Sequence, residues 1–239
     1  MDHQCVVWVG QGKGRETANQ FFKEALTEDQ HKKIRFASCD MSKAYLGAIA
    51  YWCPGAILVI DRFHIVRALN AAVDEVRKEQ WRTAIGADKQ TLKGLHWLLF
   101  VHSKNRSKAD TRRLNALKTL NRRIHREWVL KDEFEAFWEY EYTQSAESFF
   151  NGWTTAAMKS RLKPMKDFAL MLRRHAAHII PYVKTKLTHA MSEGINRVIK
   201  IVKNRASGFA NLEAFTGMIF LTVGDLNLPA QISQDFRIV

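Results

Sequence analysis

Cysteine is scarce in this sequence, and the few cysteines present form no metal-binding or disulfide pattern. Cys5, Cys39 and Cys53 include no CxxC pair, and each lies beside an apolar segment. A disulfide framework or a cysteine-based zinc site needs cysteines at suitable spacings. We therefore expect these three residues to be reduced and to lie in the core.

Long apolar runs, internal repeats and low-complexity tracts are also absent. No run reaches the roughly 18 residues that a membrane span requires. The first residues, MDHQCVVWVGQGKGR, carry an acid near their start and lack the layout of a signal peptide. An apolar share of 46% and a charged share of 26% over 239 residues are typical of a soluble globular chain with one large or two modest domains. We expect a cytoplasmic protein with no membrane partner.

Acidic residues are too few to balance the basic ones. The chain has 37 lysines and arginines against 24 aspartates and glutamates, a formal net charge of +13. This excess indicates a polyanionic partner. It is concentrated in residues 101–131, which hold ten basic residues and two acids, whereas residues 132–147 hold six acids and no base. A solvated helix face is the usual explanation of a charge run, but one so one-sided favours contact with phosphates.

Two apolar, strand-like runs each stop at an aspartate. Residues 34–39 precede Asp40, and residues 56–60 precede Asp61; helical patterns follow at residues 41–52 and directly after Asp61. Short connections imply parallel strands, whose ligands gather at the carboxyl ends. An aspartate after a strand is also a common helix N-cap, which is the more frequent role for either residue alone. Two at one sheet edge would form a carboxylate cluster for a hard cation.

The remaining pattern is mainly helical. Residues 5–9 suggest a strand, residues 15–26 a helix, and residues 27–33 a polar link. The glycines of GQGKG lack the spacing of a phosphate-binding loop and indicate a turn. Further helices are expected at residues 112–128 and 168–180, and residues 92–101 fit either a buried short helix or an insertion against the sheet. Residues 134–153 carry an aromatic stripe that predicts core packing, with base stacking as a secondary interpretation.

A second informative stretch, residues 187–215, predicts a helix that begins near Ser192. Glu193 falls in its first turn, with Asn196, Arg197 and Lys200 on the same side and an apolar side opposite. This arrangement suits a metal-binding carboxylate flanked by groups that hold phosphate. The alternative is a glutamate that complements the helix dipole beside a solvated basic face, and the pattern alone favours that alternative.

These stretches together resemble the transposases of the ISL-three family of bacterial insertion sequences. The resemblance is carried by CDMSKAYLGAIAYWCPGAILVIDRFHIVRALNAAVDEVR, by SEGINRVIKIVKNRASGFANLEAF and by VVWVGQGKGRETANQFF, and it spans essentially the whole chain. It implies a DDE transposase, in which a ribonuclease H-like fold places two aspartates and a glutamate around two Mg²⁺ or Mn²⁺ ions. Asp40 would be the second acid and Glu193 the third, both of them catalytic and metal-binding.

The resemblance also assigns supporting residues and partners. Asp61 and His64 match the DRFH motif of the family, Asp61 as an auxiliary ligand and His64 as a packing residue or one that orients a carboxylate. The implied partner is DNA, both transposon ends and target, with a homo-oligomer allowed and no small-molecule substrate, in the nucleoid of a bacterial cytoplasm. The residues expected to hold DNA are Arg112, Arg113, Arg122, Arg123, Arg197, Lys200 and Lys203.

One departure from the family is large, because no counterpart of its first catalytic aspartate and first strands is found. We expect an α/β fold with an incomplete ribonuclease H-like core in residues 1–85, a basic all-helical insertion in residues 86–185, and carboxy-terminal helices carrying the third acid in residues 186–239. Such a truncated transposase is expected to be inactive alone. The alternatives are a non-catalytic DNA-binding remnant that interferes with a full-length transposase, and a nuclease that cuts DNA without joining it.

Overall fold

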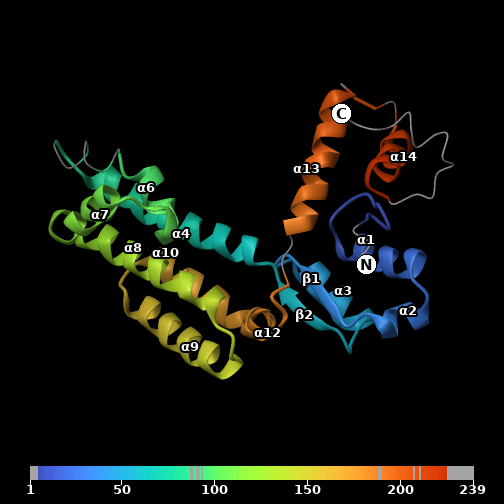
Figure 1. The fold of residues 1–239 in the computed structure, drawn as a ribbon, viewed down its shortest axis with the longest axis horizontal. Coiled ribbons are helices and arrows are strands. Elements are labelled where there is room, and N and C mark those ends of the chain that lie inside the picture. Colours follow the sequence, from blue (N-terminus) through green and yellow to red (C-terminus); the bar gives the residue numbers. More distant parts are fainter. Residues whose placement is uncertain are drawn as a thin grey trace. The chain divides into compact units, whose positions relative to one another are not determined.

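The computed structural model describes residues 5–86, 89, 92, 94–187, 190–206, 208, 209 and 211–224. In this part of the chain the fold is a mostly helical α/β arrangement with a small parallel sheet (Figure 1). The strands are β1 (Phe36–Cys39) and β2 (Ile57–Ile60). The helices are α1 (Arg15–Ala25), α2 (Glu28–Lys33), α3 (Lys43–Trp52), α4 (Arg62–Thr83), α6 (His96–Phe100), η1 (Ser103–Asn105), α7 (Lys108–Leu120), α8 (Arg122–Phe134), η2 (Glu135–Glu139), α9 (Thr143–Lys159), α10 (Lys163–Arg174), α11 (Ala176–Ile179), α12 (Tyr182–Thr185), α13 (Ala190–Arg205) and α14 (Leu212–Val223).

The chain divides into two compact units, each assembled from segments that are distant in sequence. The first unit comprises Met1–Arg35, Lys43–Gly55 and Thr188–Val239, and the second comprises Phe36–Ser42 and Ala56–Leu187. The sheet and helices α4 to α12 therefore belong to the second unit. The functional division at residues 85 and 185 stays a prediction.

The two strands that end at aspartates pair in parallel, as the sequence predicted. Cys39 lies opposite Ile60 in the register, and the amide of Asp61 donates a hydrogen bond to the carbonyl oxygen of Cys39 at 3.1 Å. Val59 and Ile60 are fully buried, whereas the first residue of β2, Ile57, is exposed. The buried ends of the strands are thus the ends from which Asp40 and Asp61 emerge.

Helix α4 is the amphipathic helix predicted after Asp61. Ile65, Leu69, Val73 and Val76 form its buried stripe, which follows the 3.6-residue period of a helix that covers a core. The helix runs for 22 residues and ends at Thr83. Helices α6, α8 and α10 pack against it.

The core of the second unit is built from helices and aromatic rings. Helix α8 packs against α4 and α7, and α10 packs against α4 and α9 (Figure 1). The indole nitrogen of Trp153 donates a hydrogen bond to the carbonyl oxygen of Leu130 at 2.8 Å, which satisfies its polar atom inside the core. The predicted core role of the aromatic stripe is confirmed, because most of its rings are buried and closed to stacking bases: Phe134, Phe137, Trp138, Phe150 and Trp153.

Two predicted helices are interrupted where a polar side chain or a turn intervenes. The single helix expected over residues 112–128 is wrong, because Asn121 ends α7 and begins α8. Its side-chain oxygen accepts hydrogen bonds from the amides of Arg123 and Ile124, which caps the new helix. Residues 168–180 are likewise divided at His175, which lies between α10 and α11.

The first unit corrects two further expectations. Residues 5–9 form no strand; instead the amide of Val6 donates to the carbonyl oxygen of Val223 at the end of α14. The polar segment 27–33 contains helix α2, which begins with a capping box between Thr27 and Gln30. That signature, a threonine followed three residues later by a glutamine, is readable from the sequence. Within this unit α1 packs on α3, where Phe22 stacks on Trp52.

Two expectations about composition are tested by the described residues. Cys5, Cys39 and Cys53 are free; Cys39 and Cys53 are buried, as predicted, whereas Cys5 is only half-buried. None of the helices in the described ranges has the length and apolarity that crossing a membrane requires.

A buried glutamate is an unusual feature of the helical core. Glu127 on α8 is fully buried, and neither carboxylate oxygen has a hydrogen-bond partner among the described residues. Burial raises the pKa of Glu127 well above its ordinary value, although the charge of Arg77 opposes that rise. The folded protein therefore binds a proton here at pH values where the unfolded chain has released it.

This proton uptake predicts a pH-dependent stability that Glu127→Gln removes. The contribution of Glu127 is most favourable below the unfolded pKa of about 4.3 and is lost as pH rises toward the raised folded pKa. Urea unfolding at pH 5 and pH 7.5 should show that the free energy of unfolding of the variant rises relative to that of the wild type at the higher pH, because only the wild type must hold or lose a proton at this buried site. Glu133→Gln, an exposed change on the same helix, is the control. Equal differences at both pH values would contradict a protonated, buried Glu127.

Candidate functional site

Asp40 directly follows β1 and is half-buried. Its Oδ1 atom accepts a hydrogen bond from the amide of Ser42 at 2.8 Å, a short turn that fixes the carboxylate at the end of the strand. Burial, and secondarily the negative charge of Asp40, raises the pKa of the neighbouring Cys39 thiol to about 12. The thiol is therefore protonated at neutral pH and is a poor metal ligand. Of the two neighbouring residues, Asp40 is the one that could bind a cation.

Asp61 follows β2 and is buried, with 3% of its surface exposed. Its Oδ1 atom accepts a hydrogen bond from the amide of Phe63 at 3.2 Å, so Asp61 is the N-cap of α4. Its Oδ2 atom lies 3.9 Å from Nε2 of His64, one helical turn away. Asp61 thus has the capping role that is the more frequent one for such a residue, and His64 lies beside its carboxylate at more than hydrogen-bond distance.

The structure brings Asp40 and Asp61 to one edge of the sheet. They follow the last paired residues of neighbouring parallel strands, which lie about 4.8 Å apart. Each carboxylate has its Oδ1 atom engaged with a backbone amide, while Oδ2 accepts no hydrogen bond from the described residues. Carboxylate oxygens are the ligands that Mg²⁺ and Mn²⁺ prefer, so the donors fit in kind. They fall short in number, because the described residues contain no group of three or more metal-ligating side chains.

Glu193 lies in the first turn of α13 and is exposed. Helix α13 packs against α14 within the first compact unit, whereas Asp40 and Asp61 belong to the second. Arg197, Lys200 and Lys203 lie on the same helix and are exposed as well. The helix and its basic surface are as predicted, and the role of Glu193 stays a prediction.

The arginines predicted to hold DNA in the helical part are all exposed. Arg112 and Arg113 lie on α7, and Arg122 and Arg123 lie at the start of α8. Arg123 forms an ion pair with Glu79 at 3.4 Å. A further basic side chain, Lys159 at the end of α9, lines a groove together with Arg122. Sequence reasoning missed Lys159 because it lies outside the basic run.

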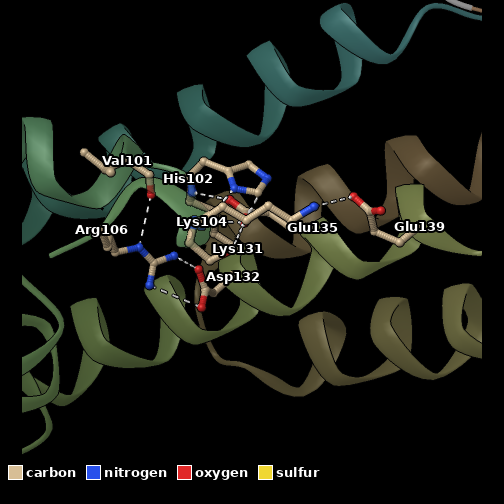
Figure 2. Close-up of polar contacts among 9 residues, drawn as sticks. Val101, His102, Lys104, Arg106, Lys131, Asp132, Glu135 and Glu139 are labelled. Atoms are coloured by element: carbon tan, nitrogen blue, oxygen red, sulfur yellow. Dashed lines mark hydrogen bonds and ion pairs between the residues drawn. The ribbon is translucent and has the colours of Figure 1, made fainter. Parts of the chain in front are cut away.

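The acid-rich segment that follows the basic run neutralises part of it. Figure 2 shows three ion pairs between the two segments, Arg106 with Asp132, Lys131 with Glu135, and Lys104 with Glu139. Burial alone would raise the pKa of Glu135, but hydrogen bonds from Ser103 and the charge of Lys131 lower it below its ordinary value. The bases of the run that are paired with acids are less available to phosphates. The predicted phosphate contacts are therefore restricted to the bases of the run that have no acidic partner.

Known proteins similar to this chain are transposases. A DDE-type, ISL3-class family model described as a transposase matches residues 1–219. The transposase for insertion sequence element IS1001 of Bordetella parapertussis is 32% identical over 214 residues, which cover 88% of this chain and 52% of that protein. The transposase for insertion sequence element IS1557 of Mycobacterium tuberculosis is 21% identical over 248 residues, covering 93% and 55% respectively.

The chain spans about half the length of the curated relatives it matches. No solved structure matches it.

The capping role of Asp61 predicts that its substitutions differ in stability. Asp61→Ala removes the acceptor for the Phe63 amide and should lower the free energy of unfolding by about 1 kcal/mol. Asp61→Ser keeps a capping oxygen and should avoid most of that loss. Urea unfolding of both variants and the wild type measures the difference. Equal stabilities of the alanine and serine variants would show that the cap contributes nothing.

Proposed function

Because this chain belongs to the ISL3-class family of DDE transposases, we propose that it is the catalytic portion of a bacterial insertion-sequence transposase. Its reaction would be cleavage of DNA at the element's ends and transfer of the strands to a target. The observation that carries the proposal is the pair of carboxylates, Asp40 and Asp61, at the carboxyl edge of two parallel strands. We further propose that these strands are part of a ribonuclease H-like core and that the basic helical part is an insertion in it.

The residues of the proposed site have distinct roles. Asp40 and Glu193 would hold Mg²⁺ or Mn²⁺, with Asp61 as an auxiliary ligand that His64 orients. When bound, such ions supply Lewis-acid stabilisation of the phosphodiester oxygens during in-line attack. The support for Asp40 is its unengaged Oδ2 atom at the strand end. The support for Glu193 is the family resemblance and its exposed position in the first turn of α13.

The basic residues would hold the DNA backbone. Arg197 and Lys200, on the helix of Glu193, are proposed to bind phosphates near the scissile bond, with Lys203 beside them. On α7 and α8 the proposed residues are Arg112, Arg113 and Arg122, together with Arg123, which would first have to release its ion pair with Glu79. Contacts of this kind position DNA without reading its sequence. They also account for the excess of 37 basic over 24 acidic residues in the chain.

A second candidate function is binding of DNA without catalysis. It is favoured by the absence of any group of three metal-ligating side chains among the described residues. In that case DNA binding would come from charge attraction alone and would weaken as the salt concentration rises. Divalent ions would have no binding site. Metal binding therefore separates the two candidates.

The catalytic proposal predicts that Mn²⁺ binding depends on Asp40 and Glu193. Isothermal titration of the chain with Mn²⁺ should show affinity at least about tenfold lower in Asp40→Asn and in Glu193→Gln, because losing a ligand costs no less than losing an outer partner. Asp29→Asn, which removes an exposed carboxylate from α2, is the matched control and should bind as the wild type does. Circular dichroism verifies the fold of each variant.

Either of two results would contradict this assignment. Equal Mn²⁺ affinity in all four proteins would show that Asp40 and Glu193 are not ligands. Absence of Mn²⁺ binding by a folded wild-type chain would favour the non-catalytic DNA-binding protein.

A further inference from the structure

The second compact unit contains an open groove whose rim is basic and whose floor is apolar. Its volume is about 730 Å³, and it runs along α8 beside the end of α7 and the carboxyl end of α9. Four basic side chains line it, Lys118, Arg122, Arg126 and Lys159. Glu133 is the one acid among the lining residues.

The floor of the groove supplies apolar surface between these charges. Val129, Leu130 and Ala156 contribute it, from α8 and α9. His125 also lines the groove, and burial, reinforced by the charge of Lys118, lowers its pKa. At neutral pH His125 is therefore a neutral hydrogen-bonding group, and the positive charge of the groove comes from the lysines and arginines.

The basic residues of the groove have no acidic partner in the described part of the chain, unlike several other bases of this unit. None of the four forms an ion pair within the described residues, whereas Lys104, Arg106 and Lys131 are each paired with an acid. A cation already paired with a carboxylate must give up that contact before it binds a phosphate. The groove cations have no such competitor.

One of these side chains is already held in position. The Nη1 atom of Arg126 donates a hydrogen bond to the carbonyl oxygen of Ser160 at 2.7 Å, across the groove from α8 to the end of α9. This bond leaves the remaining N–H groups of the guanidinium for a ligand. Arg122 and Arg126 are one turn apart on α8, about 6 Å along its axis, so both lie in reach of one stretch of a nucleic-acid strand.

We propose that this groove binds the sugar-phosphate backbone of DNA, with phosphates on its basic rim and sugars over its apolar floor. The inference rests on the proposed function and assigns one surface to it. Within the second unit, the turn between α7 and α8 lies at the end of the helical part away from β1 and β2 (Figure 1). The groove thus holds DNA that flanks the phosphodiester to be cut. Because it contacts only the sugar-phosphate backbone, its binding does not depend on the base sequence.

The test compares two triple variants that remove the same charge. The groove variant is Lys118→Gln, Arg122→Gln and Lys159→Gln, three exposed residues with no hydrogen bond or ion pair to other described residues. The control variant is Arg82→Gln, Lys104→Gln and Lys163→Gln, each exposed and paired with an acid. Binding to two labelled DNA duplexes of unrelated sequence is measured by fluorescence anisotropy in EDTA, over 50 to 200 mM salt.

The groove variant should lose affinity at least about tenfold at 100 mM salt for both duplexes. Its slope of log affinity against log salt should fall by about 2.7, since each phosphate contact contributes about 0.9. The control variant should stay within about twofold of the wild type. Arg126→Gln, measured separately because of its bond to Ser160, should lower the slope by about 0.9, with thermal unfolding monitored as the check on folding.

The possible outcomes distinguish failure of the groove assignment from failure of the proposed DNA-processing function. Equal losses in the two triple variants would overturn the groove while leaving DNA binding intact. Failure of the wild-type chain to bind either duplex would overturn the groove and the DNA-processing function together. Tighter binding of a polyglutamate peptide than of either duplex, abolished in the groove variant, would replace DNA with an acidic protein segment as the occupant.

Discussion

The parallel pairing of β1 and β2 is the interaction on which the second unit depends. The bond from the Asp61 amide to the Cys39 carbonyl oxygen continues this pairing to the residue that caps α4. Helix α4 then provides the surface on which α8 and α10 pack. One backbone ladder therefore fixes two things at once, the edge at which the carboxylates meet and the starting point of the helical core. A change that shifts the register of these strands would displace both.

Ion pairs between neighbouring segments determine which basic residues keep their charge unpaired. The basic and acidic runs are adjacent in sequence, and the chain folds so that several of their members neutralise one another around Glu135. Those pairs connect the loop after α6 to α8 and η2, a structural role. Among the bases without an acidic partner, four line one groove formed by α7, α8 and α9: Lys118, Arg122, Arg126 and Lys159. Net charge thus indicates a polyanionic partner, and the distribution of ion pairs narrows the surface that we propose for it.

The sequence alone predicted those features that depend on residues close together in the chain. The strand ends at Asp40 and Asp61, the buried stripe of α4 and the aromatic core each follow from residues close together in the chain. The break at Asn121 was missed because apolar periodicity continues through it while the side chain caps the next helix. Glu127 was unforeseen, since its burial depends on the packing of α8 against α4. Lys159 joins Arg122 in the groove only through tertiary structure. The site was predictable as a sheet edge, but the role of Glu193 depends on more than local pattern.

The discontinuous make-up of the two units has a consequence for dissecting the protein. The backbone passes from one unit to the other after Arg35, Ser42, Gly55 and Leu187. The connection between two hydrogen-bonded strands thus runs through α3, a helix that belongs to the neighbouring unit. Neither unit is encoded by one uninterrupted stretch, so a fragment that contains all of the second unit also carries α3. Removing α3 would leave β1 and β2 without the crossover that parallel strands require. Limited proteolysis at one connection would therefore nick the protein without releasing an independent domain.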